Sequence, residues 1–216
     1  MVDLEFTPVP PGSPECLMSE VIEIGAVRMS PEGEALDEFR CVVCPEYATS
    51  IAPHVRRLTG LRWIDVCDAP GFAQALAEFS AWIGDEPARL VAWSDSDRIQ
   101  IQEECEAKNL EIPANMRRWL DLQRVFPRML EVGRRHRLMS LQKAQEWYGV
   151  DVKKSSMHTA LRDAQLTADL LSLLLTGEHK EQKKALHTAC APAPASEGRG
   201  QFALAFAALA ASLEEK

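Results

Sequence analysis

The hydrophobic pattern divides the chain into short alternating segments and longer segments of helical period. Alternation and β-branched residues predict strands, whereas apolar residues three and four apart predict amphipathic helices. Strands are expected at 2–7, 20–29, 36–43, 90–93 and 117–122, with a hairpin between the second and third. Helices are expected at 69–82, 94–108, 122–131, 140–148 and 159–175. This order predicts an α/β fold in which helices cover a mixed sheet.

The segments between and after these elements set the expected domain boundary. Residues 7–19 are rich in proline and glycine and predict a loop, and residues 51–61 predict a loop with short helical turns. After Gly177 the sequence becomes charged, then rich in alanine, proline and glycine, and finally alanine-rich from Phe202 to Glu215. We therefore predict one domain at 1–177, followed by a linker and a C-terminal helix at 178–216 that could dimerise.

Composition narrows the class of protein. No apolar run is long enough to cross a bilayer, and no basic region followed by an apolar run begins the chain, so neither a membrane span nor a secretory signal is expected. Six scattered cysteines suit reduced thiols, and we expect a cytoplasmic protein. The net charge of -8 argues against broad adhesion to duplex nucleic acid, but it is compatible with an enzyme whose acidic residues hold metal ions.

Asp3 and Glu5 lie two residues apart in the first expected strand. Alternate side chains of a strand point to the same face, so their carboxylates are expected side by side. Two like charges at that distance repel each other, and a divalent cation between them relieves the repulsion. We interpret the pair as half of a metal-binding set, although an isolated Asp-x-Glu also suits a solvated strand edge.

Asp97 follows the expected strand at 90–93. If that strand runs parallel to the first and beside it, its carboxyl end lies near Asp3 and Glu5, where ligands of α/β sheets gather. Asp97 is then a third candidate ligand. Asp95 competes for this role, and an aspartate here also suits the positive end of a helix dipole.

His158 and Asp163 lie five residues apart before the last expected helix. On one continuous helix, positions five apart point about 140° away from each other and could not serve one site. Both can reach it if Thr159 caps the helix, so that His158 lies in the preceding loop. Small residues at 160, 164 and 168 would let this helix lie close to the sheet and bring Asp163 near Asp3.

Taken together, these motifs resemble the DEDDh family of 3′–5′ exonucleases, which have a ribonuclease H-like fold. The resemblance covers roughly residues 2–176 and extends to Glu20–Val27, Leu58–Gly60 and Ala92–Asp97. It is closest to the subgroup of KapD and Eri-type exonucleases, whose second motif is Trp-Gly-x-x-Asp; here Ser94 replaces the glycine, and the spacing selects Asp97 over Asp95. The five catalytic positions of the family correspond to Asp3, Glu5, Asp97, His158 and Asp163.

A second departure concerns the first strand. Family members usually carry several apolar residues before the first aspartate, whereas only Met1 and Val2 precede Asp3 here. We therefore expect either that this strand frays or that the natural chain starts upstream.

The resemblance implies a mixed five-stranded sheet and a two-metal site for Mg²⁺ or Mn²⁺, with Asp3, Glu5, Asp97 and Asp163 as ligands. It further implies that His158 is the general base, that the substrate is a single-stranded 3′ end and that nucleoside monophosphates are released. RNA is slightly favoured over DNA by the Eri-type second motif.

Substrate contacts are predicted from the same segments. Phe6 and Thr7 follow the acidic pair and could cradle the terminal nucleotide, although a core position for Phe6 is equally expected. Leu58 belongs to the family-like Leu-Thr-Gly motif. Arg134 and Arg135 lie in a basic cluster that could grip phosphates.

Two other functions fit the sequence. The first is a nucleic-acid-binding or assembly module that keeps the fold without useful catalysis, with the alanine-rich tail as its contact. The second is a proofreading exonuclease that serves a polymerase. Digestion of end-labelled single strands in the presence of manganese or chelator would separate the first alternative from an active exonuclease.

Overall fold

The structure is a computed structural model, and it describes residues 1–86, 88–129, 138–147 and 158–176. Met1–Leu175 form one compact unit. The predicted linker and C-terminal helix lie outside the described residues. No helix in the described ranges is both long and apolar enough to cross a membrane.

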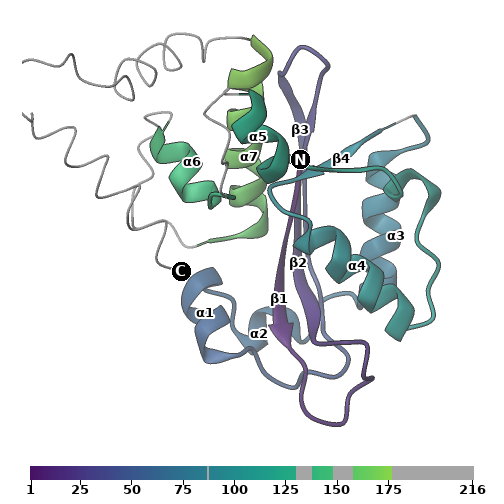
Figure 1. Cartoon of the computed structure of the whole chain (residues 1–216). Helices are drawn as coiled ribbons and strands as arrows, with labels where there is room; N and C mark the ends of the chain where they lie inside the picture. Colours follow the sequence, from purple (N-terminus) through teal and green to yellow (C-terminus); the bar gives the residue numbers. More distant parts are fainter. Residues whose placement is uncertain (87, 130–137, 148–157, 177–216) are drawn as a thin grey trace, which may run out of the picture. The chain divides into compact units, whose positions relative to one another are not determined.

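Three strands form an antiparallel sheet in the order β1-β2-β3 (Figure 1). They are β1 (Val2–Pro8), β2 (Ser19–Met29) and β3 (Ala35–Val42), and the predicted hairpin between the second and third strands is confirmed. The first strand is one residue longer than predicted, because Pro8 still pairs with Ser19. It does not fray either, since Val2 pairs with Ala26.

Two further strands, β4 (Leu90–Ala92) and β5 (Trp119–Asp121), pair in parallel, and β4 lies against β1. The predicted α/β architecture of five strands in mixed directions is confirmed. Hydrogen bonding joins them as a sheet of three strands and a sheet of two. The carboxyl end of β4 leads directly to Asp97.

Helices cover both faces of the strands (Figure 1). In chain order they are α1 (Pro53–Thr59), α2 (Trp63–Val66), α3 (Phe72–Ile83), α4 (Ser96–Ala107), a 3-10 turn (Ala114–Met116), α5 (Leu122–Met129), α6 (Leu141–Trp147) and α7 (Ala160–Thr176). The five helices predicted between residues 69 and 175 all occur, with ends within three residues of those expected.

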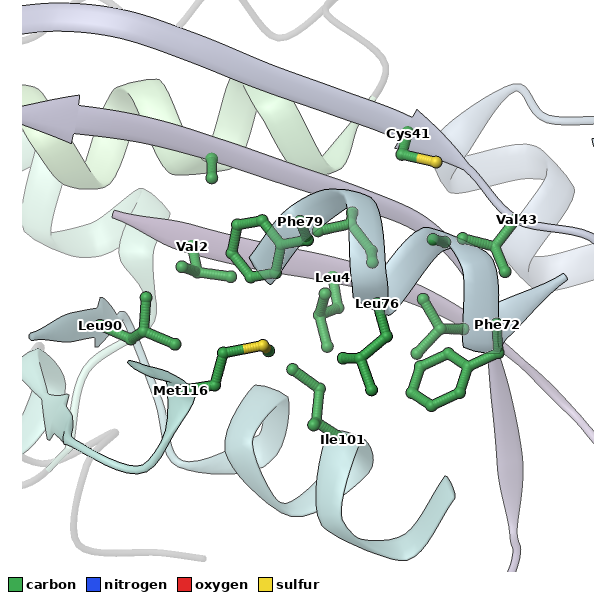
Figure 2. Packing of buried hydrophobic residues seen from close by; sticks show 14 of the residues in the cluster. Val2, Leu4, Cys41, Val43, Phe72, Leu76, Phe79, Leu90, Ile101 and Met116 are labelled. Carbon is green, nitrogen blue, oxygen red and sulfur yellow. The ribbon is translucent and has the colours of Figure 1, made fainter. Parts of the chain in front are cut away.

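The main core lies between the antiparallel sheet and α3 and α4. Figure 2 shows Leu4 of β1, Phe79 of α3 and Ile101 of α4 in this cluster, and all three are buried. Residues of β2 alternate between the two faces: Ile24 joins this core, whereas Val27 packs against α7. The sheet therefore has α3 and α4 on one face and α7 on the other.

Candidate active site

A pocket of about 280 Å³ opens beside the carboxyl end of β4. Segments far apart in the sequence line it: β1, the loop and first turn after β4, and the start of α7. Its walls are completed by Leu58 of α1 and Leu141 of α6. All five predicted catalytic residues line this one pocket: Asp3, Glu5, Asp97, His158 and Asp163.

Asp3 and Glu5 are held by the pairing of β1 with β2. Asp3 lies opposite Gly25, and Glu5 lies opposite Glu23. The register shifts between Glu5 and Phe6, because β2 contains one extra residue, Ile22, at that point. Such bulges bend a strand and redirect its side chains, and they are frequent beside active sites. The acidic pair thus lies on regular strand immediately before the irregularity.

Asp97 is fixed by a hydrogen bond between distant parts of the chain. Its Oδ1 accepts the backbone N–H of Leu4 at 2.9 Å, and only 4% of the residue is exposed. The competing Asp95 does not line the pocket, because both of its carboxylate oxygens bind the guanidinium of Arg98, at 2.7 and 2.6 Å. This ion pair lowers the pKa of Asp95. Asp97 is therefore the aspartate of this segment that faces Asp3.

Helix α4, which carries Asp97, is anchored to β2 by buried charges. Glu104 accepts the N–H of Val21 at 2.8 Å and binds Lys108 Nζ at 2.8 Å. Lys108 also binds Glu20 of β2 at 2.9 Å, and both glutamates are fully buried. Breaking one partner of such a network leaves an uncompensated buried charge, so the contact fixes α4 on the sheet.

The start of α7 brings His158 and Asp163 together as the sequence predicts. Thr159 caps the helix: its Oγ1 accepts the N–H of Arg162 at 3.2 Å. His158 lies just before the helix, Asp163 lies in its first turn, and His158 Nδ1 is 3.0 Å from Asp163 Oδ2. The backbone N–H of His158 donates to Leu58 O at 2.9 Å, which joins this segment to α1.

Close contact between α7 and β2 depends on Gly25. A Cβ at this position would lie 2.0 Å from Leu161 N and 2.1 Å from the carbonyl carbon of Ala160. The small side chains of Ala160, Ala164 and Ala168 are buried at the same interface. Gly25 pairs with Asp3, so the residue that admits α7 lies directly opposite the first acidic residue.

Glu23 is a functional position that our sequence reasoning missed. It is fully buried, and its two carboxylate oxygens bind Arg40 Nε at 2.5 Å and the N–H of Ala160 at 3.0 Å. The second bond satisfies a free N–H in the first turn of α7 and ties the helix that carries Asp163 to the strand beside Glu5. An acidic residue in the middle of an apolar strand was the available signal.

Three of the carboxylates form a candidate cation site. One oxygen each from Asp3, Glu5 and Asp163 can be chosen so that all three lie within 4.8 Å of one another. Burial, together with the neighbouring carboxylates, raises the pKa of Glu5 to about 8 and that of Asp3 well above its usual range. Burial also raises the pKa of Asp97 to about 7, against the lowering effect of the Leu4 N–H. These oxygen ligands carry like charges that repel one another, and a hard divalent cation would relieve that repulsion.

Comparison with known proteins agrees with this geometry. Residues 1–171 match the protein-family model described as Exonuclease (RNase_T). The chain belongs to the exonuclease family. The DEDDh resemblance of its motifs is confirmed by this match together with the fold.

Individual relatives of the exonuclease family support the assignment. ERI1 exoribonuclease 2 of Danio rerio is 28% identical over an alignment of 182 residues, and the match covers 73% of this chain and 31% of the relative. This chain therefore spans about a third of that relative's length.

Among solved structures, the nuclease domain of 3'hExo, a DEDDh family member bound to rAMP, has a TM-score of 0.70. It is 23% identical, and the match covers 82% of this chain and 90% of that domain. A zinc-bound complex of E. coli ExoI with single-stranded DNA has a TM-score of 0.62 at 15% identity, over 87% of this chain and 42% of that one.

The residues predicted to contact substrate in this exonuclease-family chain do not all lie at the pocket. Phe6 is half-buried, lines the pocket and also packs against the main core, so it occupies both places that the sequence allowed. Leu58 lines the pocket and is 51% exposed. Thr7 is fully buried outside the pocket lining, where its Oγ1 accepts the N–H of Ala52; this differs from the prediction and assigns Thr7 to the scaffold. Arg134 and Arg135 lie outside the described residues.

Proposed function

We propose that this chain is a metal-dependent 3′–5′ exonuclease that releases nucleoside monophosphates from single-stranded nucleic acid. One observation carries the proposal. Carboxylates from two distant segments converge within 4.8 Å in a pocket that also holds His158, 3.0 Å from one of them. Family membership supports the same reaction class.

The donor set suits two ions of Mg²⁺ or Mn²⁺. Asp3, Glu5, Asp97 and Asp163 offer only oxygen, which both ions prefer, and their mutual repulsion favours occupation by positive charge. Bound there, such ions would acidify a water molecule and neutralise the charge that develops on the phosphate. The four carboxylates would hold them.

His158 is the general base in this proposal. An ionised Asp163 carboxylate can only accept a hydrogen bond, so the ring hydrogen of His158 would lie on Nδ1, 3.0 Å from Asp163 Oδ2. Nε2 is then free to accept a proton from the attacking water. The side chain of His158 is 55% exposed, which leaves it accessible to water and substrate. Asp163 would orient the ring.

RNA is our favoured substrate. The match to a protein named an exoribonuclease supports RNA, as does the similarity to a nuclease domain bound to rAMP. Leu58 of α1 and Phe6 of β1, which both line the pocket, would contact the terminal nucleotide. The fold is also that of an exonuclease in complex with single-stranded DNA, so the assay must include both polymers.

The test is digestion of 5′-labelled RNA and DNA single strands with Mg²⁺, with Mn²⁺ and with chelator. We expect stepwise shortening from the 3′ end, complete dependence on the metal, and loss of activity in Asp3→Asn with the fold retained. Glu32→Gln, which removes one exposed charge in the turn between β2 and β3, is the matched control and should remain fully active. Full activity of Asp3→Asn would refute the assignment. An inactive wild-type protein that still binds the strands would favour the binding-module alternative.

A further inference from the structure

A basic surface adjoins one wall of the pocket. From residue 47 to residue 64 the chain contains no Asp or Glu, but it contains three arginines and a histidine, although the whole chain has a net charge of -8. This stretch includes α1, whose last turn carries Arg56 and Arg57. Both arginines are exposed, and they directly precede Leu58, which lines the pocket.

Several other arginines of the described residues are already paired. Arg98 binds Asp95, Arg124 binds Asp121, and Arg62 binds Asp65. Arg56 and Arg57, in contrast, form no ion pair with any carboxylate of the described residues. Their guanidinium groups are therefore available to an anion from outside the chain.

The surface is rigidly attached to the site. Val55 and Thr59 bury the inner face of α1, and Val55 packs with Ile22 of β2. The Ala52 N–H before the helix donates to Thr7 Oγ1 of β1 at 3.1 Å, and Leu58 O accepts the N–H of His158. Helix α1 thus contacts both the strand that carries the acidic pair and the segment that carries the general base.

Apolar side chains accompany the charges on the outer surface of this segment. Leu58 and Ile64 are 51% and 66% exposed. Cations beside exposed apolar surface are the combination that single-stranded nucleic acid requires, because phosphates and bases alternate along the strand.

We propose that Arg56 and Arg57 bind the phosphates of the nucleotides that precede the 3′-terminal one, so that the strand enters the pocket across α1. This inference rests on the proposed function and specifies the path of its substrate. A strand whose last nucleotide occupies the pocket must leave past one wall, and the wall at Leu58 leads to unpaired positive charge. The surface also compensates for the negative pocket and steers the polyanion toward it.

The test is the double variant Arg56→Ala/Arg57→Ala. Its matched control is Arg117→Ala/Arg118→Ala, an adjacent exposed pair that removes the same charge. Arg118 O accepts the N–H of Leu90, so that pair lies at the amino end of β4, opposite the end that leads to the pocket. The measurements are kcat and KM on an unstructured RNA of about 20 nucleotides and on a dinucleotide, over a range of salt concentrations.

For the α1 variant we expect KM for the long strand to rise roughly 10-fold, with kcat and dinucleotide cleavage unchanged. Loss of two phosphate contacts should reduce the slope of log(kcat/KM) against log salt by about 1.4, at about 0.7 per contact for a single strand. The control pair should change neither quantity. Arg56→Lys/Arg57→Lys should restore most of the affinity, since phosphate contact needs the charge.

Three outcomes would overturn the proposal. Equal effects of the two alanine pairs would mean that only net charge matters. Unchanged KM and salt slope would mean that the strand leaves past another wall. A lower melting temperature with an unchanged salt slope would mean that the arginines only stabilise the end of α1. Binding of the labelled RNA, measured by anisotropy in the His158→Ala background, tests the surface separately, so that failure of catalysis is distinguished from failure of this path.

Discussion

Gly25→Ala should disrupt the active site without changing any residue that lines it. The added methyl group would meet the backbone of Leu161 and Ala160 at 2.0 to 2.5 Å. Backbone atoms at a helix start cannot rotate away as a flexible side chain can. The first turn of α7 must therefore move off β2, and His158 and Asp163 must move with it.

The size of this movement follows from the contact distances. Ordinary van der Waals contact begins at 3.4 Å, so the 2.0 Å approach to Leu161 N requires a shift of about 1.4 Å (3.4 minus 2.0). Displacement of a catalytic group by about 1 Å can cost roughly 100-fold in rate. Overpacking of this kind also costs about 1–3 kcal/mol of stability. We expect kcat/KM to fall about 100-fold and the Mg²⁺ concentration for half-maximal activity to rise.

Gly71→Ala provides the matched control. Gly71 precedes α3 with φ of -70°, and a Cβ there meets no atom within 4 Å, so activity and melting temperature should be nearly unchanged. The assay is digestion of a labelled single strand across a metal titration, with circular dichroism to confirm folding. A folded Gly25→Ala protein with wild-type kcat/KM and metal dependence would refute the reasoning, since α7 could not then lie so close to β2.

Three further predictions address the charges of the site. Glu23→Ala should lower both melting temperature and activity, because it removes the acceptor for the Ala160 N–H. Glu23→Gln keeps an acceptor oxygen and should retain more of both. Equal losses for the two variants in thermal unfolding and digestion assays would contradict this role. The metal-free protein should lose stability as pH rises from about 5 to about 8, because the raised pKa of Glu5 means that the folded protein holds a proton that the unfolded chain has released. Added Mg²⁺ should therefore raise the melting temperature more at pH 8 than at pH 5. Stability that increased with pH in the presence of chelator would contradict the expectation. His158→Ala should reduce kcat by about 100-fold or more while stabilisation by Mg²⁺ is largely kept; loss of that stabilisation would make His158 a metal ligand.

The elements and the acidic set could be predicted because their signals are local. Alternation at Glu20–Met29 and helical spacing in 69–82 each lie within one segment, and the cap at Thr159 correctly separated His158 from the helix of Asp163. The choice of Asp97 over Asp95 depended on the family spacing. Its physical reason, the hydrogen bond from Leu4, joins residues 93 positions apart, and the sequence alone does not contain it.

The roles of residues that depend on contacts between distant segments could not be predicted from local sequence patterns. Thr7 was predicted at the substrate because it follows Glu5, but continued pairing of β1 with β2 buries it beneath the start of α1. The role of Glu23 requires knowledge that β2 passes under α7, and Gly25 looks like any glycine in a strand until that helix is placed against it. Each of these positions is fixed by a neighbour more than a dozen residues away.

The acidic residues that the proposed function requires lower the stability of the metal-free fold. Asp3, Glu5, Asp97 and Asp163 repel one another, and the repulsion is largest when no cation is present. The fold pairs the buried charges of β2, Glu23 with Arg40 and Glu20 with Lys108, whereas none of the four site carboxylates forms an ion pair with a lysine or arginine of the described residues. Neutralising Asp3 should therefore stabilise the metal-free protein while it abolishes the proposed activity, as expected where strain at an active site serves binding. If replacing Asp3 raises the stability of the metal-free protein and removes the activity, then the carboxylate of Asp3 serves cation binding and not folding.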